Sequence, residues 1–380
     1  MALLGALALV LAACGAEADP QPEPVEETDV EAGSEEVADD ADAAADDADR
    51  LQIVATTSII GDLVANVTGD DAEVTVLMAP GVDPHGYEPS ASDGRILREA
   101  DLVVANGLML EENLVSVLEA VEEEGGNVLS LAEQLDPIDF DWDGPGHAHG
   151  HDDHDDHDDH GHDDHDDHGH DDHDDHGHDD HDDHGHDDHD GHAHADEDPH
   201  FWFDPLRTSD AVGMIAEAIA ELDDRFEADE WMARADAYAE QLVELDEEML
   251  EMFETIPEAN RSLVTNHDAL GYLAYRYDFE VLGTVIPGSS TQAETDARGF
   301  AELVETLEEA GVEVVFADNT DSTVLAEQLA SEVVGRSDLD VQVVELYTGS
   351  LGEPGSGADS YLGMLRTTST LITEALGGTV

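Results

Sequence analysis

The chain of 380 residues contains no lysine, a single cysteine (Cys14) and only 11 basic residues against 97 acidic ones. Binding a nucleic acid requires clustered Lys and Arg that displace counterions from the phosphates, so we expect no nucleic-acid partner. A single cysteine argues against a disulfide framework and against a thiolate metal site in the mature domain. The acidic surplus indicates a solubilising surface of the kind found in salt-adapted proteins, with an acidic docking face as the alternative.

The apolar run at the amino terminus, residues 2–13, is too short to span a bilayer as a helix. It ends in Leu-Ala-Ala directly before Cys14, which predicts a lipoprotein signal over residues 1–14 with Cys14 as the acylated residue. No basic residue precedes the run, so an ordinary signal peptide or a true start further upstream is the alternative. Residues 15–50 are rich in Ala, Asp, Glu and Pro and predict a disordered acidic tether. We therefore expect an extracytoplasmic protein anchored to the cell membrane by lipid.

Outside the low-complexity segments about 280 residues remain, enough for two domains with cores of their own. Helical stretches such as 90–99, which opens with a Ser-x-x-Asp cap, and 301–310 alternate with short apolar runs. This alternation predicts an α/β fold with mainly parallel sheets. A charged segment at about 229–255 predicts one long helix between two lobes. The expected strands are 52–56, 73–78, 102–105, 127–130, 262–265, 280–285, 313–317 and 341–346.

These elements predict an N-terminal lobe over residues 51–228, a linking helix over 229–256 and a C-terminal lobe over 257–380. Of the 22 histidines, 19 fall between His147 and His194 in a run built on the unit HGHDDHDD. We assign residues 147–196 to a disordered insert of the N-terminal lobe, because the run contains no core-forming residues. Its imidazoles and carboxylates offer many interchangeable sites for zinc, nickel or copper, so we interpret it as a metal collector. A solvated insert without a role is the alternative.

The three other histidines are His85 in GVDPHGYEPSASD, His200 in DEDPHFWFDP and His267 in VTNHDALGY. Each lies in a turn-rich segment just after a strand or before a helix, where a parallel sheet opens its binding crevice. Any one of them could be a cap or a satisfied core histidine. Together they indicate a zinc site with three histidine ligands.

Three histidines and a water also activate the nucleophile in zinc hydrolases, which makes an enzyme the rival interpretation. The sequence offers no convincing general base, and we expect the nearby acids Glu88 and Asp268 to hold ligand histidines by hydrogen bonds. We therefore predict that the chain is not an enzyme.

Four motifs, PGVDPHGYEPSASD, NGLMLEENL, DPHFWFDP and VTNHDALGYLAYRY, resemble in this order the cluster A-I zinc and manganese solute-binding proteins of ABC transporters, the ZnuA-like group. The resemblance extends from about Leu51 to the C terminus. It implies two α/β lobes joined by one rigid helix, with metal held in the cleft between them by His85 and His200 from the first lobe and His267 from the second. It also implies a permease and an ATPase as partners, and we expect a monomer.

Zinc-type members of this group have His at the third position, whereas manganese-type members often have Glu, so the resemblance implies Zn(II) as the transported ligand, with Mn(II) as the alternative. Many relatives supply a fourth ligand from the Asp of a Thr-Asp-Ser sequence, but this chain has Gly349 there. A water, a carboxylate such as Asp318 or a histidine of the collector could complete the site, and we favour water or a mobile ligand. A surface metal buffer or adhesin without a transporter is a further alternative.

Overall fold

Short apolar segments form two parallel sheets in the computed structural model, which describes residues 50–139, 197–288, 290–293, 295 and 297–380. Contacts divide the chain into Met1–Asp49 and a compact unit, Arg50–Val380. The leader with Cys14, the tether up to residue 49 and the run 147–194 lie outside the described residues, so the interpretations of these segments stay predictions. Within the described ranges, no helix is both long and apolar enough to cross a membrane.

The first sheet has the strand order β2-β1-β3-β4, and each neighbouring pair is parallel. Successive side chains of a strand point to opposite faces. Accordingly, Ile53 and Ala55 join the main core, whereas Val54 and Val103 pack in a separate cluster on the other face. The strands are β1 (Leu51–Ala55), β2 (Ala72–Val76), β3 (Leu102–Ala105) and β4 (Val128–Ser130).

The second sheet repeats this arrangement with the order β6-β5-β7-β8, again with parallel pairs. Leu263 and Phe316 join the main core, and Val264 and Val315 belong to a cluster on the opposite face. The strands are β5 (Ser262–Thr265), β6 (Glu280–Thr284), β7 (Val314–Asp318) and β8 (Gln342–Leu346). All eight predicted strands are thus confirmed, with no end shifted by more than two residues. We refer to the parts built on the two sheets as the N-terminal and C-terminal lobes.

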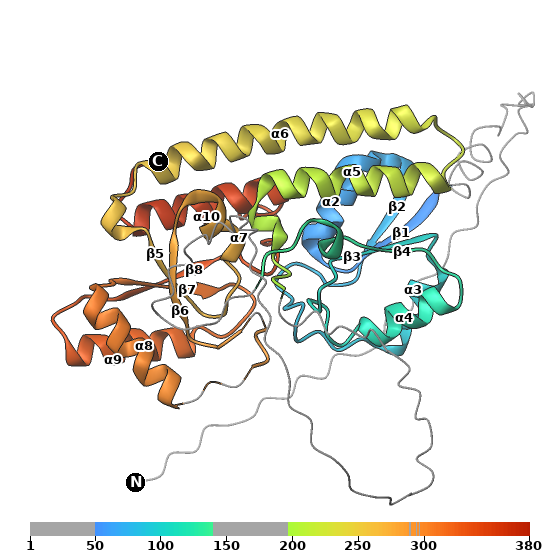
Figure 1. Ribbon diagram of the computed structural model, residues 1–380. Coiled ribbons are helices and arrows are strands. Elements are labelled where there is room, and N and C mark those ends of the chain that lie inside the picture. Colours follow the sequence, from blue (N-terminus) through green and yellow to red (C-terminus); the bar gives the residue numbers. More distant parts are fainter. Residues whose placement is uncertain (1–49, 140–196, 289, 294, 296) are drawn as a thin grey trace, which may run out of the picture. The chain divides into compact units, whose positions relative to one another are not determined.

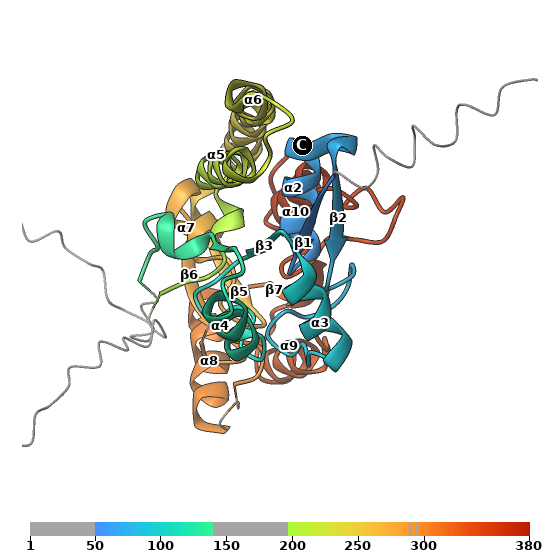
Figure 2. The same ribbon diagram turned by 90° about the vertical axis from the view of Figure 1, so that its right-hand side faces the viewer.

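Helices cover both faces of each sheet. Figures 1 and 2 show α5 and α6 on one side of the sheets and α3, α4, α8 and α9 on the other. The helices are α2 (Ser58–Thr68), α3 (Ala91–Glu99), α4 (Val115–Glu123), α5 (Pro205–Leu222), α6 (Ala228–Glu254), α7 (Gly271–Tyr277), α8 (Ala297–Ala310), α9 (Val324–Arg336) and α10 (Tyr361–Ala375), with 3-10 turns at Gly69–Asp71, Ala132–Gln134, Phe201–Phe203 and Glu258–Asn260. The cap predicted at Ser90 is confirmed as a capping box with Asp93. Helix α8 begins at Ala297, four residues before the predicted start.

The long helix α6 connects the two lobes, as the charged segment predicted. It has 27 residues, and its buried positions recur every three or four residues from Trp231 through Tyr238 and Leu245 to Phe253. This stripe packs on α2 and α5 of the N-terminal lobe and on α10 of the C-terminal lobe. Figure 1 shows α6 passing above both sheets. The two lobes therefore share one continuous core, while the lobe boundaries at residues 228 and 257 stay a prediction.

Candidate metal centre

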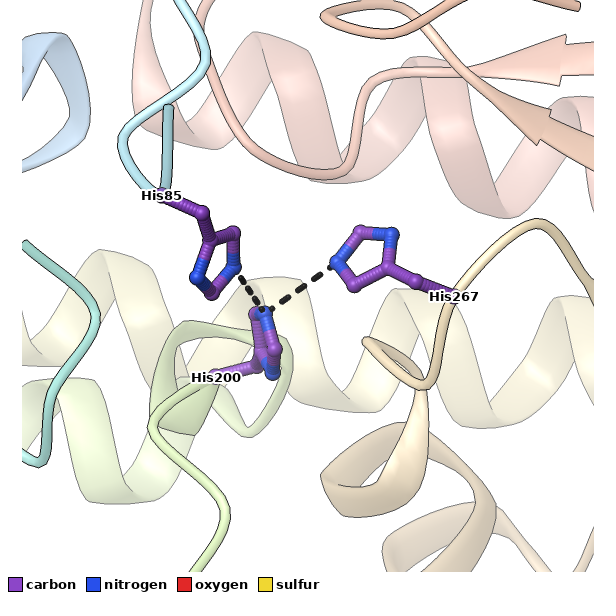
Figure 3. A group of neighbouring side chains, drawn as sticks. All are labelled: His85, His200 and His267. Carbon is purple, nitrogen blue, oxygen red and sulfur yellow. Dashed lines mark hydrogen bonds between the residues drawn. The ribbon is translucent and has the colours of Figure 1, made fainter. Parts of the chain in front are cut away.

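The three isolated histidines come from both lobes. His267 lies two residues after β5, where the order of the second sheet reverses between β5 and β7. Such a switch point leaves a crevice at the carboxyl ends of parallel strands. His85 lies between β2 and α3, and His200 directly precedes the turn Phe201–Phe203. Figure 3 shows the three rings pointing toward one another.

The sequence Asp-Pro-His builds the same turn twice. The Oδ1 atom of Asp83 accepts the backbone N–H of His85 at 3.0 Å, and Oδ1 of Asp198 accepts that of His200 at 2.9 Å. Aspartate favours such local turns, and the intervening proline fixes φ and needs no hydrogen-bond acceptor. The two turns lie far apart in the sequence, yet each holds the backbone of its histidine in a similar way.

The ring nitrogens Nε2 of the three histidines converge. His200 Nε2 lies 3.4 Å from Nε2 of His85 and 3.4 Å from Nε2 of His267. The three residues are between 1% and 3% exposed. They form a group whose ligand atoms all lie within 4.8 Å of one another, and no carboxylate among the described residues belongs to it.

This spacing can be compared with that around a metal ion. Zinc binds imidazole nitrogen at ~2.0–2.1 Å, so two nitrogens on a tetrahedral ion lie about 3.3–3.4 Å apart. The two Nε2 separations of 3.4 Å agree with this value. Three neutral imidazoles around one point also suit other divalent transition metals. The arrangement can therefore hold one ion and leave one tetrahedral position for an exchangeable ligand.

Carboxylates lie behind two of the rings, and that of Asp198 is within hydrogen-bonding distance of its ring. His200 Nδ1 lies 2.7 Å from Asp198 Oδ1. His267 Nδ1 lies 3.3 Å from Oδ2 of Asp318, the last residue of β7, which neighbours β5 in the sheet. A carboxylate beside the outer nitrogen of a ligating histidine fixes its orientation and raises its basicity. The inner nitrogens of these two rings are thus directed at the common centre.

Burial and the two neighbouring rings lower the pKa of His85 well below the ordinary histidine range. Burial, followed by the charge of His267, does the same for His200. Both rings therefore stay neutral at neutral pH, and the neutral ring is the form that ligates a metal. Burial raises the pKa of Asp198 to about 7 and also that of Asp268 to about 7.

The comparisons with known proteins agree with this geometry. Residues 53–375 match the ZnuA family, described as zinc-uptake complex component A periplasmic. The manganese-binding lipoprotein MntA of Bacillus subtilis (strain 168) is 30% identical over 345 residues, which cover 88% of this chain and 93% of the relative. The zinc-binding protein TroA of Treponema pallidum (strain Nichols) is 27% identical over 335 residues, or 88% and 91% of the two chains.

This chain belongs to the ZnuA family. The resemblance inferred from the four motifs is confirmed. Members of the family are solute-binding proteins that serve a permease and an ATPase of the ABC type, so the chain is a metal-binding transport protein and not an enzyme, as predicted.

Solved structures confirm the fold. The periplasmic zinc-binding protein TroA from Treponema pallidum aligns with a TM-score of 0.68 at 26% identity, covering 86% of this chain and 99% of that one. The Mn-bound periplasmic metal-binding protein from Candidatus Liberibacter asiaticus aligns with a TM-score of 0.62 at 21% identity, covering 85% and 98%. The predicted α/β fold with two lobes is the fold of these two structures.

Gly349 of this ZnuA-family chain lies next to Thr320. A Cβ atom added to Gly349 would lie 3.0 Å from Thr320 Oγ1 and 3.5 Å from Cδ of Pro84. The same Thr320 hydroxyl donates to Asp318 Oδ1 at 2.9 Å. Asp318 therefore contacts Thr320 with one oxygen and faces the outer nitrogen of His267 with the other. Its role as a fourth ligand stays a prediction.

The carboxylates near the rings differ from those expected. Glu88 is exposed, Asp268 is half-buried with its Oδ1 unpaired, and no hydrogen bond or ion pair joins either acid to a histidine within the described residues, so the prediction that these two acids hold the histidines was wrong. The acids that reach the rings are Asp198, Asp318 and, at 3.9 Å from His85 Nδ1, Glu112. The Asp-Pro-His repeat could have indicated Asp198. Asp318 reaches His267 only through the pairing of β5 with β7, and Glu112 reaches His85 from a different segment of the N-terminal lobe. A sequence motif encodes neither contact.

Proposed function

We propose that this chain captures Zn(II) outside the cytoplasm with His85, His200 and His267 and delivers it to an ABC permease and its ATPase. The observation that carries the proposal is the convergence of three buried Nε2 atoms, with that of His200 lying 3.4 Å from each of the other two, which suits an ion bound by nitrogen. One exchangeable position and three imidazole donors give binding that is tight and still reversible, as a carrier requires.

The choice of zinc over manganese rests on the donor set. Manganese prefers carboxylate, carbonyl and water oxygens, and a nitrogen site binds Mn(II) more weakly than Zn(II) in the usual order of divalent metals. The cluster in the described residues consists of three imidazoles. The manganese-binding name of the Bacillus subtilis relative supports the alternative, Mn(II) capture by the same residues.

We further propose that Cys14 carries a lipid anchor and that residues 147–194 collect metal for the centre. The apolar leader that ends at Cys14 supports the first point, and the relative MntA is named a lipoprotein. The repeated unit HGHDDHDD supports the second, because its imidazoles and carboxylates are interchangeable metal donors.

Replacing His85, His200 or His267 singly with Ala tests the assignment. Loss of a residue that only hydrogen-bonds to a metal ligand typically lowers the metal affinity about 10–100-fold. Each of these changes removes a direct donor, so it should lower the zinc affinity by more than that. Calorimetric titration with zinc and manganese, in competition with a chelator that masks weak sites, measures the affinity. His170→Ala, within the histidine run, is the matched control and should leave the tight site unchanged.

Deletion of residues 147–194 separates the two kinds of site. The proposal predicts one tight zinc ion per chain after the deletion and fewer weak ones. Loss of the tight ion on deletion would place the site in the run instead. Tighter binding of manganese than of zinc by the deleted chain would favour the manganese alternative.

A further inference from the structure

A short segment of the C-terminal lobe contacts two carboxylates that flank His85. The segment comprises residues 290–292, in the connection between β6 and α8 (Figure 1). Ser290 Oγ donates to Glu112 Oε1, and Thr291 Oγ1 donates to Asp83 Oδ2 at 2.7 Å. Gln292 Nε2 lies 3.4 Å from the same Asp83 oxygen. Both carboxylates belong to the N-terminal lobe, so these bonds join the lobes beside the metal centre.

The same two carboxylates are the ones that face His85. Asp83 Oδ1 accepts the backbone N–H of His85, and Glu112 Oε1 lies 3.9 Å from its ring nitrogen Nδ1. That nitrogen is buried and has no hydrogen-bond partner among the described residues. The outer nitrogens of His200 and His267 instead lie 2.7 and 3.3 Å from a carboxylate oxygen. Of the three outer nitrogens, that of His85 is therefore the farthest from a carboxylate oxygen, at 3.9 Å.

Close packing at Gly86 shows that the segment lies directly against the turn that carries His85. A Cβ atom at Gly86 would lie 2.9 Å from Gln292 Nε2 and 3.0 Å from Asp83 Oδ2. Thr291 is 9% exposed, so its hydroxyl bond to Asp83 is largely shielded from water. Hydrogen bonds to a carboxylate are stronger than neutral ones and gain strength where water is excluded.

We propose that Asp83 and Glu112 are positioning residues for His85 and that, with Ser290, Thr291 and Gln292, they form an interlobe clasp that slows the release of bound metal. The inference rests on the proposed function of the centre. Release requires one ligand to turn away first, and His85 has the weakest support at its outer nitrogen. While the clasp is closed, Asp83 fixes the backbone of His85 and Glu112 stands beside its ring. Separation of the lobes removes both hydroxyl donors at once and frees this ligand.

The double variant Ser290→Ala/Thr291→Val tests the clasp in the full chain. It removes both donors but none of the three histidines, so zinc should still bind at one tight ion per chain. Zinc should leave the variant at least about tenfold faster than the wild type. Loss of residues that hydrogen-bond to a metal ligand typically has effects of about 10–100-fold, and tenfold is the lower end of that range. Stopped-flow transfer of zinc to a chelator dye measures the release rate, and a titration of the same samples gives the stoichiometry.

Three further measurements distinguish positioning from general destabilisation. Thr291→Ser keeps the hydroxyl and should release zinc within about twofold of the wild-type rate, given the small net energy of a retained hydrogen bond. Thr306→Val, which removes a hydroxyl on the exposed face of α8, is the matched control and should not change the rate. The visible spectrum of bound Co(II) should change in Glu112→Gln, because it reports the ligand geometry at His85.

Unchanged release from the double variant, at full zinc stoichiometry, would overturn the clasp while leaving the proposed function intact. The same holds if the Co(II) spectrum of Glu112→Gln matches that of the wild type. Absence of a tight ion from the wild-type chain would instead overturn the proposed function.

Discussion

At the scale of single residues, the centre combines three histidines, two of which burial keeps neutral, with carboxylates that lie beside them. Two of the acids, Asp83 and Asp198, occupy the same place in two Asp-Pro-His turns, yet they contact their histidines differently. Asp198 also reaches the ring of His200, whereas Asp83 bonds only to the backbone of His85 within that turn and to the C-terminal lobe beyond it. The turn of Asp198 thus fixes the ring of His200 by itself, whereas the turn of Asp83 depends on contact between the lobes to fix His85.

The pH dependence of zinc affinity should come from Asp198 and not from His85 or His200. Burial raises the pKa of Asp198 to about 7, so this carboxyl is protonated below pH 7. Binding of zinc must then displace one proton from it. Both rings have a lowered pKa, so they gain protons only well below the ordinary histidine value of ~6.5. Affinity should therefore fall about tenfold per pH unit from pH 7 downward, the slope expected for a single proton.

Titration of zinc at pH 5.5, 6.5 and 7.5 measures this slope, and Asp198→Asn is the comparison because an amide does not titrate. The variant should bind more weakly at pH 7.5 but with a flatter dependence on pH. Equal slopes for the two proteins would mean that another group accepts the proton.

The grouping of the three histidines could be predicted from the sequence because a histidine outside the run is rare here and each one lies in a distinctive turn. The acids behind them could be predicted only where the contact is local, as for Asp198. The contact of Asp318 with His267 requires β5 and β7 to be neighbours, and that of Glu112 with Ser290 requires the two lobes to meet. Sequence order and hydrophobic pattern contain no direct record of such pairings.

At the scale of elements, the turn that carries His200 continues into α5 through a single capping residue. Asp204 Oδ1 accepts the backbone N–H of Leu206 at 3.0 Å and of Arg207 at 3.4 Å. Asp204 also lies 3.5 Å from the guanidinium of Arg207 and 3.7 Å from that of Arg276 in the C-terminal lobe. The first turn of α5 is therefore fixed both to the ligand segment and to the opposite lobe.

Two substitutions at Asp204 separate the cap from the ion pairs. Asp204→Asn removes the charge but retains an oxygen that accepts the backbone N–H groups, whereas Asp204→Ala removes both. The loss of an N-cap costs ~1 kcal/mol, within a range of about 0.5–2, so the Ala variant should have a free energy of unfolding lower than that of the Asn variant by this amount. Urea denaturation of the metal-free proteins measures the difference. Equal stabilities would show that the cap contributes nothing.

The secondary-structure elements themselves followed well from the sequence. Strands such as β3 and β7 are short and buried at nearly every position, and this pattern is typical of parallel sheets between helices. The start of α8 was predicted four residues late because its first turn, from Ala297 to Phe300, contains little apolar periodicity. Element ends depend on capping contacts more than on hydrophobic pattern.

At the scale of the whole molecule, helix α6 stabilises the folded chain, whereas the excess of acidic residues destabilises it. Helix α6 packs on both lobes and gives them a common core. The sequence carries 97 acidic and 11 basic residues, and most arginines already pair with a nearby acid, as Arg234 does with Asp71 at 2.6 Å. The unpaired acids repel one another most strongly in the folded state, where they are closest.

Salt should therefore stabilise this protein. Raising NaCl from 0.01 M to 1 M shortens the screening length from ~30 Å to ~3 Å, which weakens the repulsion among many acids and the attraction in a few surface ion pairs. The repulsive pairs are far more numerous, and exposed ion pairs contribute only ~0–1 kcal/mol each. The melting temperature of the metal-free chain should rise by several degrees.

Thermal unfolding followed by circular dichroism at 0.01, 0.1 and 1 M NaCl measures this effect, with KCl at the same ionic strengths as the control for specific ions. Screening depends on ionic strength alone, so both salts should give the same curve. The chain without residues 147–194 carries fewer acids and should show a smaller rise if the acids of that run contribute to the repulsion. A melting temperature that stays constant or falls with salt would mean that the ion pairs of the arginines outweigh the repulsion among the acids.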